Sequence, residues 1–83
     1  MFINKTPENK NNLCGTNVTR RRIEMQISQR ELADRLQIAG LDIDKNAIQR
    51  IEAGKRFVTD IEVVFLAKVL DISLQELLLN NKA

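Results

Sequence analysis

The sequence predicts an all-α fold, a compact bundle of five short helices. Apolar residues recur at the spacing of a helix face in successive short segments. A residue that can cap a helix N-terminus stands before each of the last four segments, and Gly follows two of them. The apolar residues are mostly aliphatic, since the chain has three Phe and no Trp or Tyr, and such cores are typical of packed helices.

The first helix is expected over about residues 16–25. A helical projection puts three side chains on its inner side: Val18, Arg22 and Ile23. Arg20 and Arg21 then face outward, where they either contact a polyanion or are simply solvated. Cys14, just before the helix, is interpreted as a small buried hydrophobe rather than a redox switch.

The second helix begins at the capping box Ser28-Gln29-Arg30-Glu31, in which the hydroxyl and the carboxylate each accept a hydrogen bond from an end amide. Its apolar stripe has helical spacing: Leu32, Ala33, Leu36 and Ala39. Gly40 is a natural stop, and residues 41–43 lead to Asp44, a good N-cap for the next helix.

The third helix, residues 44–53, is barely two turns long and is followed by Gly54. Its inner side is apolar: Ala47, Ile48 and Ile51. The opposite arc carries four basic or amide side chains and no carboxylate: Lys45, Asn46, Gln49 and Arg50. Taken alone, such an arc is either an ordinary solvated face or a surface that reads a ligand.

The last two helices begin at two further capping boxes, Thr59-Asp60-Ile61-Glu62 and Ser73-Leu74-Gln75-Glu76. The fifth helix contains three consecutive leucines, Leu77 to Leu79. Three neighbouring positions cannot all face inward on one helix, so at least one leucine is expected to contact a partner, and a second copy of the chain is the natural candidate.

The helices are expected to form one domain over residues 13–80, between a flexible N-terminal arm at residues 1–12 and a tail at residues 81–83. The arm is polar and carries the only Pro. Leu13 to Gly15 are expected to attach it to the domain. Within residues 1–30 the net charge is +4, whereas the end of the chain is acidic, an asymmetry typical of a protein whose one side meets a polyanion.

Composition also excludes several function classes. A single Cys rules out an internal disulfide framework, and no apolar run approaches the roughly 20 residues of a membrane span, which favours a soluble, cytoplasmic protein. The chain has no His, no metal-spaced cluster and no phosphate-cradling Gly loop. We therefore expect no enzyme activity, no metal and no cofactor.

The second and third helices, joined by a Gly-containing turn, have the outline of a helix-turn-helix. In that motif the second helix enters the DNA major groove, where Arg and Lys match guanine edges and Asn and Gln match adenine edges. All four residue types occur in the arc of the third helix. Four residues around it are candidates for phosphate contacts: Ser28, Gln29, Lys55 and Arg56.

Three segments resemble the Cro/phage-repressor (Xre-type) helix-turn-helix domains, which have the lambda-repressor-like fold. They are SQRELADRL, AIQRIEAGKR and LAKVLDISLQELL, which occur in the family's order over roughly residues 15–80. The resemblance implies that Lys45, Asn46 and Arg50 face bases, with Gln49 nearby. It also implies phosphate contacts by Gln29 and Lys55, and a structural ion pair between Arg22 and Glu52.

One departure from the family pattern is an insertion. Leu36 and Ile48 are twelve residues apart where the family has seven, which resembles a subgroup with a longer connection between the second and third helices. The insert contains three apolar residues that need cover: Ile38, Leu41 and Ile43. Ile61 and Phe65, an i,i+4 pair on the fourth helix, are expected to supply it.

The sequence thus predicts a DNA-binding transcriptional regulator of bacterial or phage type. We expect a repressor, associated with the nucleoid, that binds a palindromic operator as a homodimer, because two third helices must reach half-sites about 34 Å apart. The alternative is a protein-interaction module, antitoxin-like or regulator-binding, that uses the surface of Ile61, Phe65 and Leu79.

Overall fold

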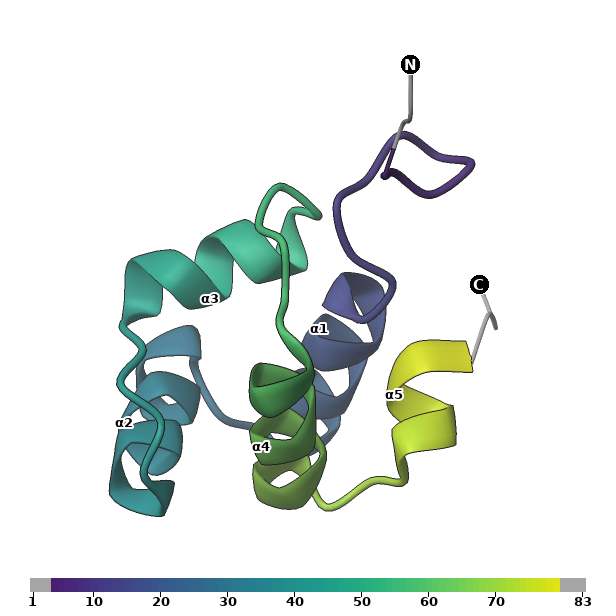
Figure 1. Cartoon of the computed structure of the whole chain (residues 1–83). Coiled ribbons are helices and arrows are strands. Elements are labelled where there is room, and N and C mark those ends of the chain that lie inside the picture. Colours follow the sequence, from purple (N-terminus) through teal and green to yellow (C-terminus); the bar gives the residue numbers. More distant parts are fainter. Residues whose placement is uncertain (1–3, 80–83) are drawn as a thin grey trace.

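The computed structural model describes residues 4–79, and this part of the chain is all-α, as the sequence predicts (Figure 1). Its helices are α1 (Gly15–Glu24), α2 (Gln29–Ala39), α3 (Lys45–Glu52), α4 (Asp60–Leu70) and α5 (Leu74–Leu79). The expected tail at residues 81–83, the last residue of the expected domain and the first three residues of the expected arm lie outside the described residues.

Four of the helices form a bundle, and α3 lies across one end of it (Figure 1). α3 packs on α1 and α2, while α4 packs on α1, α2 and α5. The largest fully covered side chains come from all five helices: Val18, Leu32, Leu36, Ile48, Ile51, Leu66, Leu70 and Leu77. Each such burial is worth about 1.5–3 kcal/mol, so one shared core holds α3 in place.

The expected helix starts are present, with one difference. Thr59 and Glu62 form a complete capping box on α4. At α5 the Ser73 hydroxyl likewise accepts a hydrogen bond from the Glu76 amide, and the Glu76 carboxylate accepts one from the Ser73 amide. At α2 the Ser28 hydroxyl accepts from the Glu31 amide, 3.0 Å away, but the Glu31 carboxylate turns outward. It pairs with Arg35 at 2.7 Å, one turn along the helix. The box at α2 is therefore only half formed.

Two of the expected inward side chains are exposed. Ile23 is 60% exposed because it lies about 140° around α1 from the fully covered Val18. Asn17 takes a buried place instead, and its Nδ2 donates to the Leu77 carbonyl at 2.8 Å, which ties α1 to α5. Ala39 is exposed in the last turn of α2, directly before the C-cap residue Gly40.

The insertion forms the end of α2 and a linker that runs back along that helix toward α3 (Figure 1). Ile43 is buried, and the Gln37 Nε2 donates to its carbonyl at 2.7 Å. Leu41 and Phe65 both pack on the core, and the Phe65 ring lies beside Gly40 at the end of α2. The expectation is wrong for Ile38 and Ile61: Ile38 is 87% exposed and Ile61 is also exposed, because each points to the solvent side of its helix.

The structure also places Cys14 and the three consecutive leucines at the end of α5. Cys14 is buried directly before α1, and burial raises the pKa of its thiol to about 11, so it packs as a small hydrophobe. Of the three consecutive leucines in α5, Leu77 is buried, Leu78 is half-buried and Leu79 is exposed. Leu79 is thus the one of these three that the core leaves uncovered.

Candidate nucleic-acid interface

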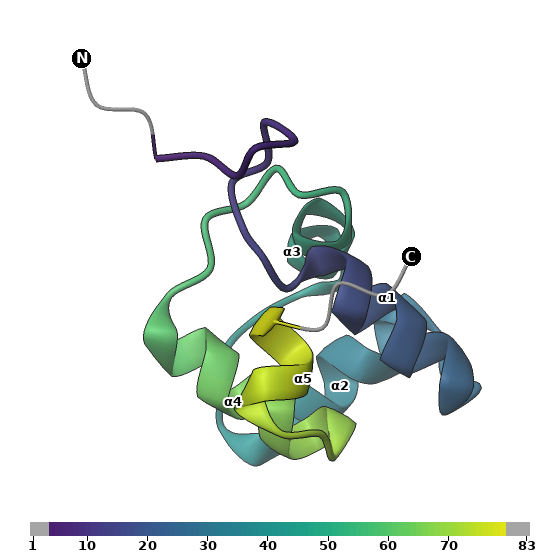
Figure 2. The same ribbon diagram turned by 90° about the vertical axis from the view of Figure 1, so that its right-hand side faces the viewer.

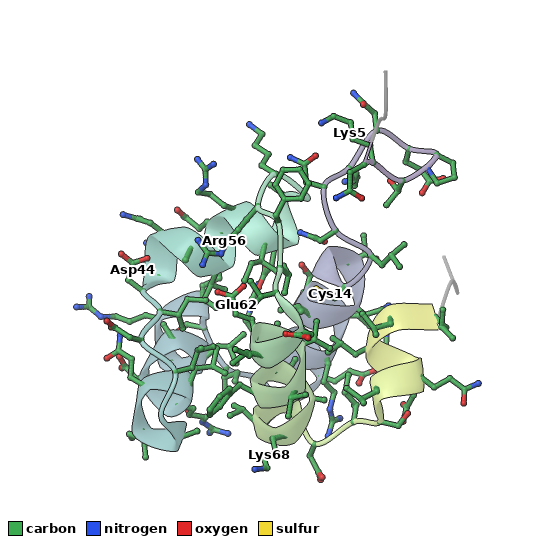
Figure 3. All side chains as sticks on the ribbon, in the orientation of Figure 1. Lys5, Cys14, Asp44, Arg56, Glu62 and Lys68 are labelled. Carbon is green, nitrogen blue, oxygen red and sulfur yellow. The ribbon has the colours of Figure 1, made fainter. Side chains whose placement is uncertain are left out.

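The exposed face of α3 carries the four side chains that the sequence predicts for base contacts. Lys45, Asn46, Gln49 and Arg50 are all exposed, while Ile48 and Ile51 on the opposite side are fully buried. Figure 3 shows nitrogen-tipped side chains rising from α3, away from the rest of the bundle. The structure therefore brings these four groups together on one free surface.

The N-terminal end of α3 is capped by its own neighbour. Asp44, labelled at this end in Figure 3, accepts a hydrogen bond from the Ala47 amide at 2.8 Å through its Oδ1. Without an acidic residue in its first turn, α3 begins with Lys45 and Asn46 directly after this cap. The cap fixes where the helix starts, and with it the direction in which the exposed face points.

A three-residue network holds α3 to the helices beneath it. The Arg22 guanidinium of α1 donates to Glu52 through Nε to Oε2 at 2.8 Å and through Nη2 to Oε1 at 3.1 Å. Gln29 of α2 donates its Nε2 to the same Oε1 at 3.0 Å. The side chains of Arg22 and Glu52 are 15% and 8% exposed, so this bidentate pair is covered.

The network also changes the charge of α3. Burial raises the pKa of Glu52, but hydrogen bonds from Arg22 and Gln29 and the charge of Arg22 outweigh it, so this pKa lies below its usual value. The hydrogen bond to Glu52 raises the pKa of Arg22 in turn. Glu52, which is the carboxylate of α3, is thus ionised but neutralised by its partner. The exposed face keeps its basic and amide character.

Close packing at the C-terminal end of α3 requires a glycine in α1. A Cβ on Gly15 would overlap the carbonyl oxygen of Ile51. The absence of a side chain therefore lets the start of α1 approach the last turn of α3 directly. This contact and the Arg22 network brace α3 at the same end.

The four residues predicted to contact phosphates differ in their exposure and in whether they already have a partner in the protein. Lys55 is exposed just past α3, and Ser28 is exposed at the start of α2. Gln29 is half-buried with its amide committed to Glu52. Arg56 points toward α4, where its Nη2 donates to Glu62 at 2.7 Å (Figure 3). The sequence provides no sign of this last pair, because Glu62 already has a role in the capping box of α4.

Sequence reasoning missed two residues at this site, Asn11 and Asn12. The backbone amide of Asn11 donates to the Gly54 carbonyl at 2.7 Å, and its Nδ2 donates to the Lys55 carbonyl at 2.9 Å. The Nδ2 of Asn12 donates to the carbonyls of Ile51 and Arg56, at 3.1 and 2.9 Å. The chain is therefore held two residues before the expected attachment point. Nothing local in the sequence could link these residues to a turn some forty positions later.

Figures 1 and 2 agree that this N-terminal segment lies beside the turn that follows α3. Among residues 4–79, no group of three or more His, Cys, Asp or Glu side chains is placed to hold a metal ion. No helix in the described range is long and apolar enough to cross a membrane.

The comparisons with known proteins agree with this architecture. A family model described as Helix-turn-helix (HTH_3) matches residues 18–77, a span that includes α2 and α3 whole. The structure is similar to the crystal structure of the restriction-modification controller protein C.AhdI from Aeromonas hydrophila. The two chains share 28% sequence identity at a TM-score of 0.66, over 76% of this chain and 84% of that chain. A search of curated proteins finds no match.

Proposed function

Because the chain belongs to the Cro/C1-type helix-turn-helix family, we propose that it is a sequence-specific DNA-binding regulator of transcription. It acts as a repressor in the cytoplasm, bound at the nucleoid, and inserts α3 into the major groove of a palindromic operator. The likeness to a controller protein supports the regulator class rather than an enzyme.

The observation that carries this proposal is the exposed face of α3. Its four polar side chains offer the paired donors and acceptors that base edges require: Lys45, Asn46, Gln49 and Arg50. Glu52, which would otherwise repel phosphates, is covered and neutralised by Arg22. An eight-residue helix is about 12 Å long, which is about the width of the major groove, so α3 can lie within it.

The residues that flank α3 have two different roles: some are assigned phosphate contacts, and others hold α3 in place. Lys55 is exposed and is assigned a phosphate contact, as is Ser28 with the backbone amides at the start of α2. Gln29 braces α3 through Glu52 and lies at the same end of α2. Arg56 is engaged with Glu62, so any phosphate contact that it makes has to compete with this ion pair.

We assign the dimer contact to α5. Leu79 and Leu74 are both exposed on this short helix, which lies away from α3 (Figure 1). An apolar contact at this position leaves both copies of α3 free to meet DNA. Two-fold symmetry then accounts for the palindromic operator, since each copy reads one half-site.

A second candidate function has one observation in its favour. Ile61 and Val64 are exposed within one turn of each other on α4, and Phe57 is exposed three residues before this helix begins. Such a surface suits a protein-interaction module. This role predicts stoichiometric capture of a protein partner with little dependence on salt, and no DNA binding.

Selection of bound duplexes from a randomised DNA pool tests the proposal. The wild type is compared with a variant in which Lys45, Asn46, Gln49 and Arg50 are all Ala, and with Lys68→Ala as a control far from α3. We expect a palindromic consensus from the wild type and the control, and none from the variant. Because all four side chains are exposed, circular dichroism should show that the variant keeps its helices. If the wild type enriches no sequence, α3 does not read bases.

A further inference from the structure

We propose that residues 4–12 form a second DNA-contacting element, in which Lys5 and Lys10 bind phosphates beside the C-terminal end of α3. This inference rests on the proposed function and extends the site beyond the helix-turn-helix itself. It is carried by the way in which this segment is docked, by the position of its two lysines and by the dimensions of the major groove.

One backbone amide and two side-chain amides dock the segment, by hydrogen bonds, on the turn after α3. Asn11 and Asn12 together donate to four carbonyl groups of that turn and of the last turn of α3, at 2.7–3.1 Å. The Oδ1 of Asn12 also accepts from the Gly15 amide at 2.9 Å. Three of these carbonyls, those of Gly54, Lys55 and Arg56, lie past the end of α3, and the fourth, that of Ile51, gains a second donor besides the Gly54 amide.

A small loop then brings the two lysines to the same place. The Thr6 amide donates to the Lys10 carbonyl at 2.8 Å, and the Lys10 amide donates to the Thr6 hydroxyl at 3.0 Å. The Asn9 amide donates to the Thr6 carbonyl at 2.8 Å, which closes the loop. Lys5 therefore precedes one end of the closed loop and Lys10 forms the other end.

Both lysines are positioned by neighbours of the α3 turn. The Nζ of Lys5 lies 2.8 Å from the Oδ1 of Asn11, an exposed contact that keeps this ammonium group beside the docked residue. The methylene chain of Lys10 passes so close to Gly54 that a Cβ there would lie 2.6 Å from its Cδ. Gly54 thus leaves room for the Lys10 stem, and exposed Lys55 is the next residue.

The location of this basic group matches the edge of the groove. Since α3 is about as long as the groove is wide, its C-terminal end faces the phosphate backbone on one side. Figure 3 shows Lys5 on the side toward which the α3 side chains rise, and Figure 2 shows the segment beyond the turn after α3. Glu8 is the one carboxylate among residues 4–12, so the lysines leave the segment net positive.

A purely structural role would leave the lysines without a function. In that case Asn11 and Asn12 cap α3, and the charges of Lys5 and Lys10 have no effect on DNA binding. The two roles differ in salt dependence, because each phosphate neutralised by a lysine releases condensed counterions and steepens the fall of affinity with salt.

The test measures the affinity of the full chain for one duplex over a range of salt concentrations. Lys5→Gln and Lys10→Gln are made singly and together, with Lys68→Gln as the charge-matched control at the opposite end of the molecule (Figure 3). Each single variant, Lys5→Gln or Lys10→Gln, should flatten the slope of log affinity against log salt by about 0.9, and the double variant should flatten it by about 1.8. The control should keep the wild-type slope.

Thermal unfolding of the same proteins separates folding from binding. We expect unchanged unfolding temperatures, since neither lysine belongs to the core. A double variant with the wild-type slope would overturn the inference while leaving the proposed function intact. If the wild type binds no duplex at all, the proposed function itself is wrong.

Discussion

Arg22 and Glu52 join the first and third helices through a bidentate ion pair, with Nε of Arg22 2.8 Å from Oε2 and Nη2 3.1 Å from Oε1 of Glu52. Gln29 adds a third hydrogen bond from α2. One carboxylate therefore fixes the position of α3 on both supporting helices. The same contact removes a negative charge from the surface that we assign to DNA.

Replacing Glu52 by Gln should destabilise the domain. The amide cannot pair with the Arg22 charge, which is then left largely covered, and a lost hydrogen bond to a charged group costs about 1.5–3 kcal/mol. Urea unfolding of wild type and variant measures the difference. Glu31→Gln is the matched control, because its pair with Arg35 is exposed and such pairs contribute about 0–1 kcal/mol. An equal decrease of the free energy of unfolding in the two variants would contradict the structural role of Glu52.

Stability should fall in acid partly through Glu52. Its pKa is lowered on folding, so its contribution is fully present above the unfolded-state pKa of about 4.3 and is lost as pH falls through the lower folded-state pKa. Free energies of unfolding measured from pH 7 to pH 2 should therefore decline below about pH 4. The decline should be shallower in Glu52→Gln. An identical pH profile in both proteins would show that another carboxyl group is responsible.

Residues on the exposed face of α3 should differ in their effect on DNA specificity. Asn46→Ala and Arg50→Ala should each weaken binding to the selected operator by about 1–3 kcal/mol and relax the preference at one base step. Lys55→Ala should weaken all sequences alike and flatten the salt slope, as expected of a phosphate contact. Titrations with operator variants and with unrelated duplexes measure both effects. Arg50→Ala with wild-type preference at every step would refute its base contact.

The exposed leucines of α5 should control self-association. Changing Leu74 and Leu79 together to Ser should reduce the sedimentation mass from two chains to one, because the apolar contact is lost. Ile38→Ser is the control, since Ile38 is even more exposed but lies on α2. A wild-type mass of one chain, with and without DNA, would eliminate the dimer.

Local signals in the sequence located the elements of this fold. The start of each of the last four helices was predictable because a capping side chain interacts with amides two or three positions away. The inner face of α3 was predictable from the spacing of Ala47, Ile48 and Ile51, and its polar arc followed from the same projection. The resemblance to a known family also indicated that Arg22 and Glu52 would pair, although they are thirty residues apart.

Other features depend on which distant segments meet, and only the tertiary structure decided them. Ile23 is exposed because α1 presents Asn17 and Val18 to its neighbours, a choice that helical periodicity leaves open. Arg56 pairs with Glu62 because the turn after α3 leads it back toward α4.

The docking of the N-terminal segment shows the same limit. The sequence determined that residues 1–12 are polar and low in aliphatic residues, which is typical of a free arm. It could not reveal that the carbonyls at the end of α3 would lie within reach of Asn11 and Asn12. These carbonyl groups come within reach of Asn11 and Asn12 only once α3 has formed and packed, so the assembled fold decided the pairing.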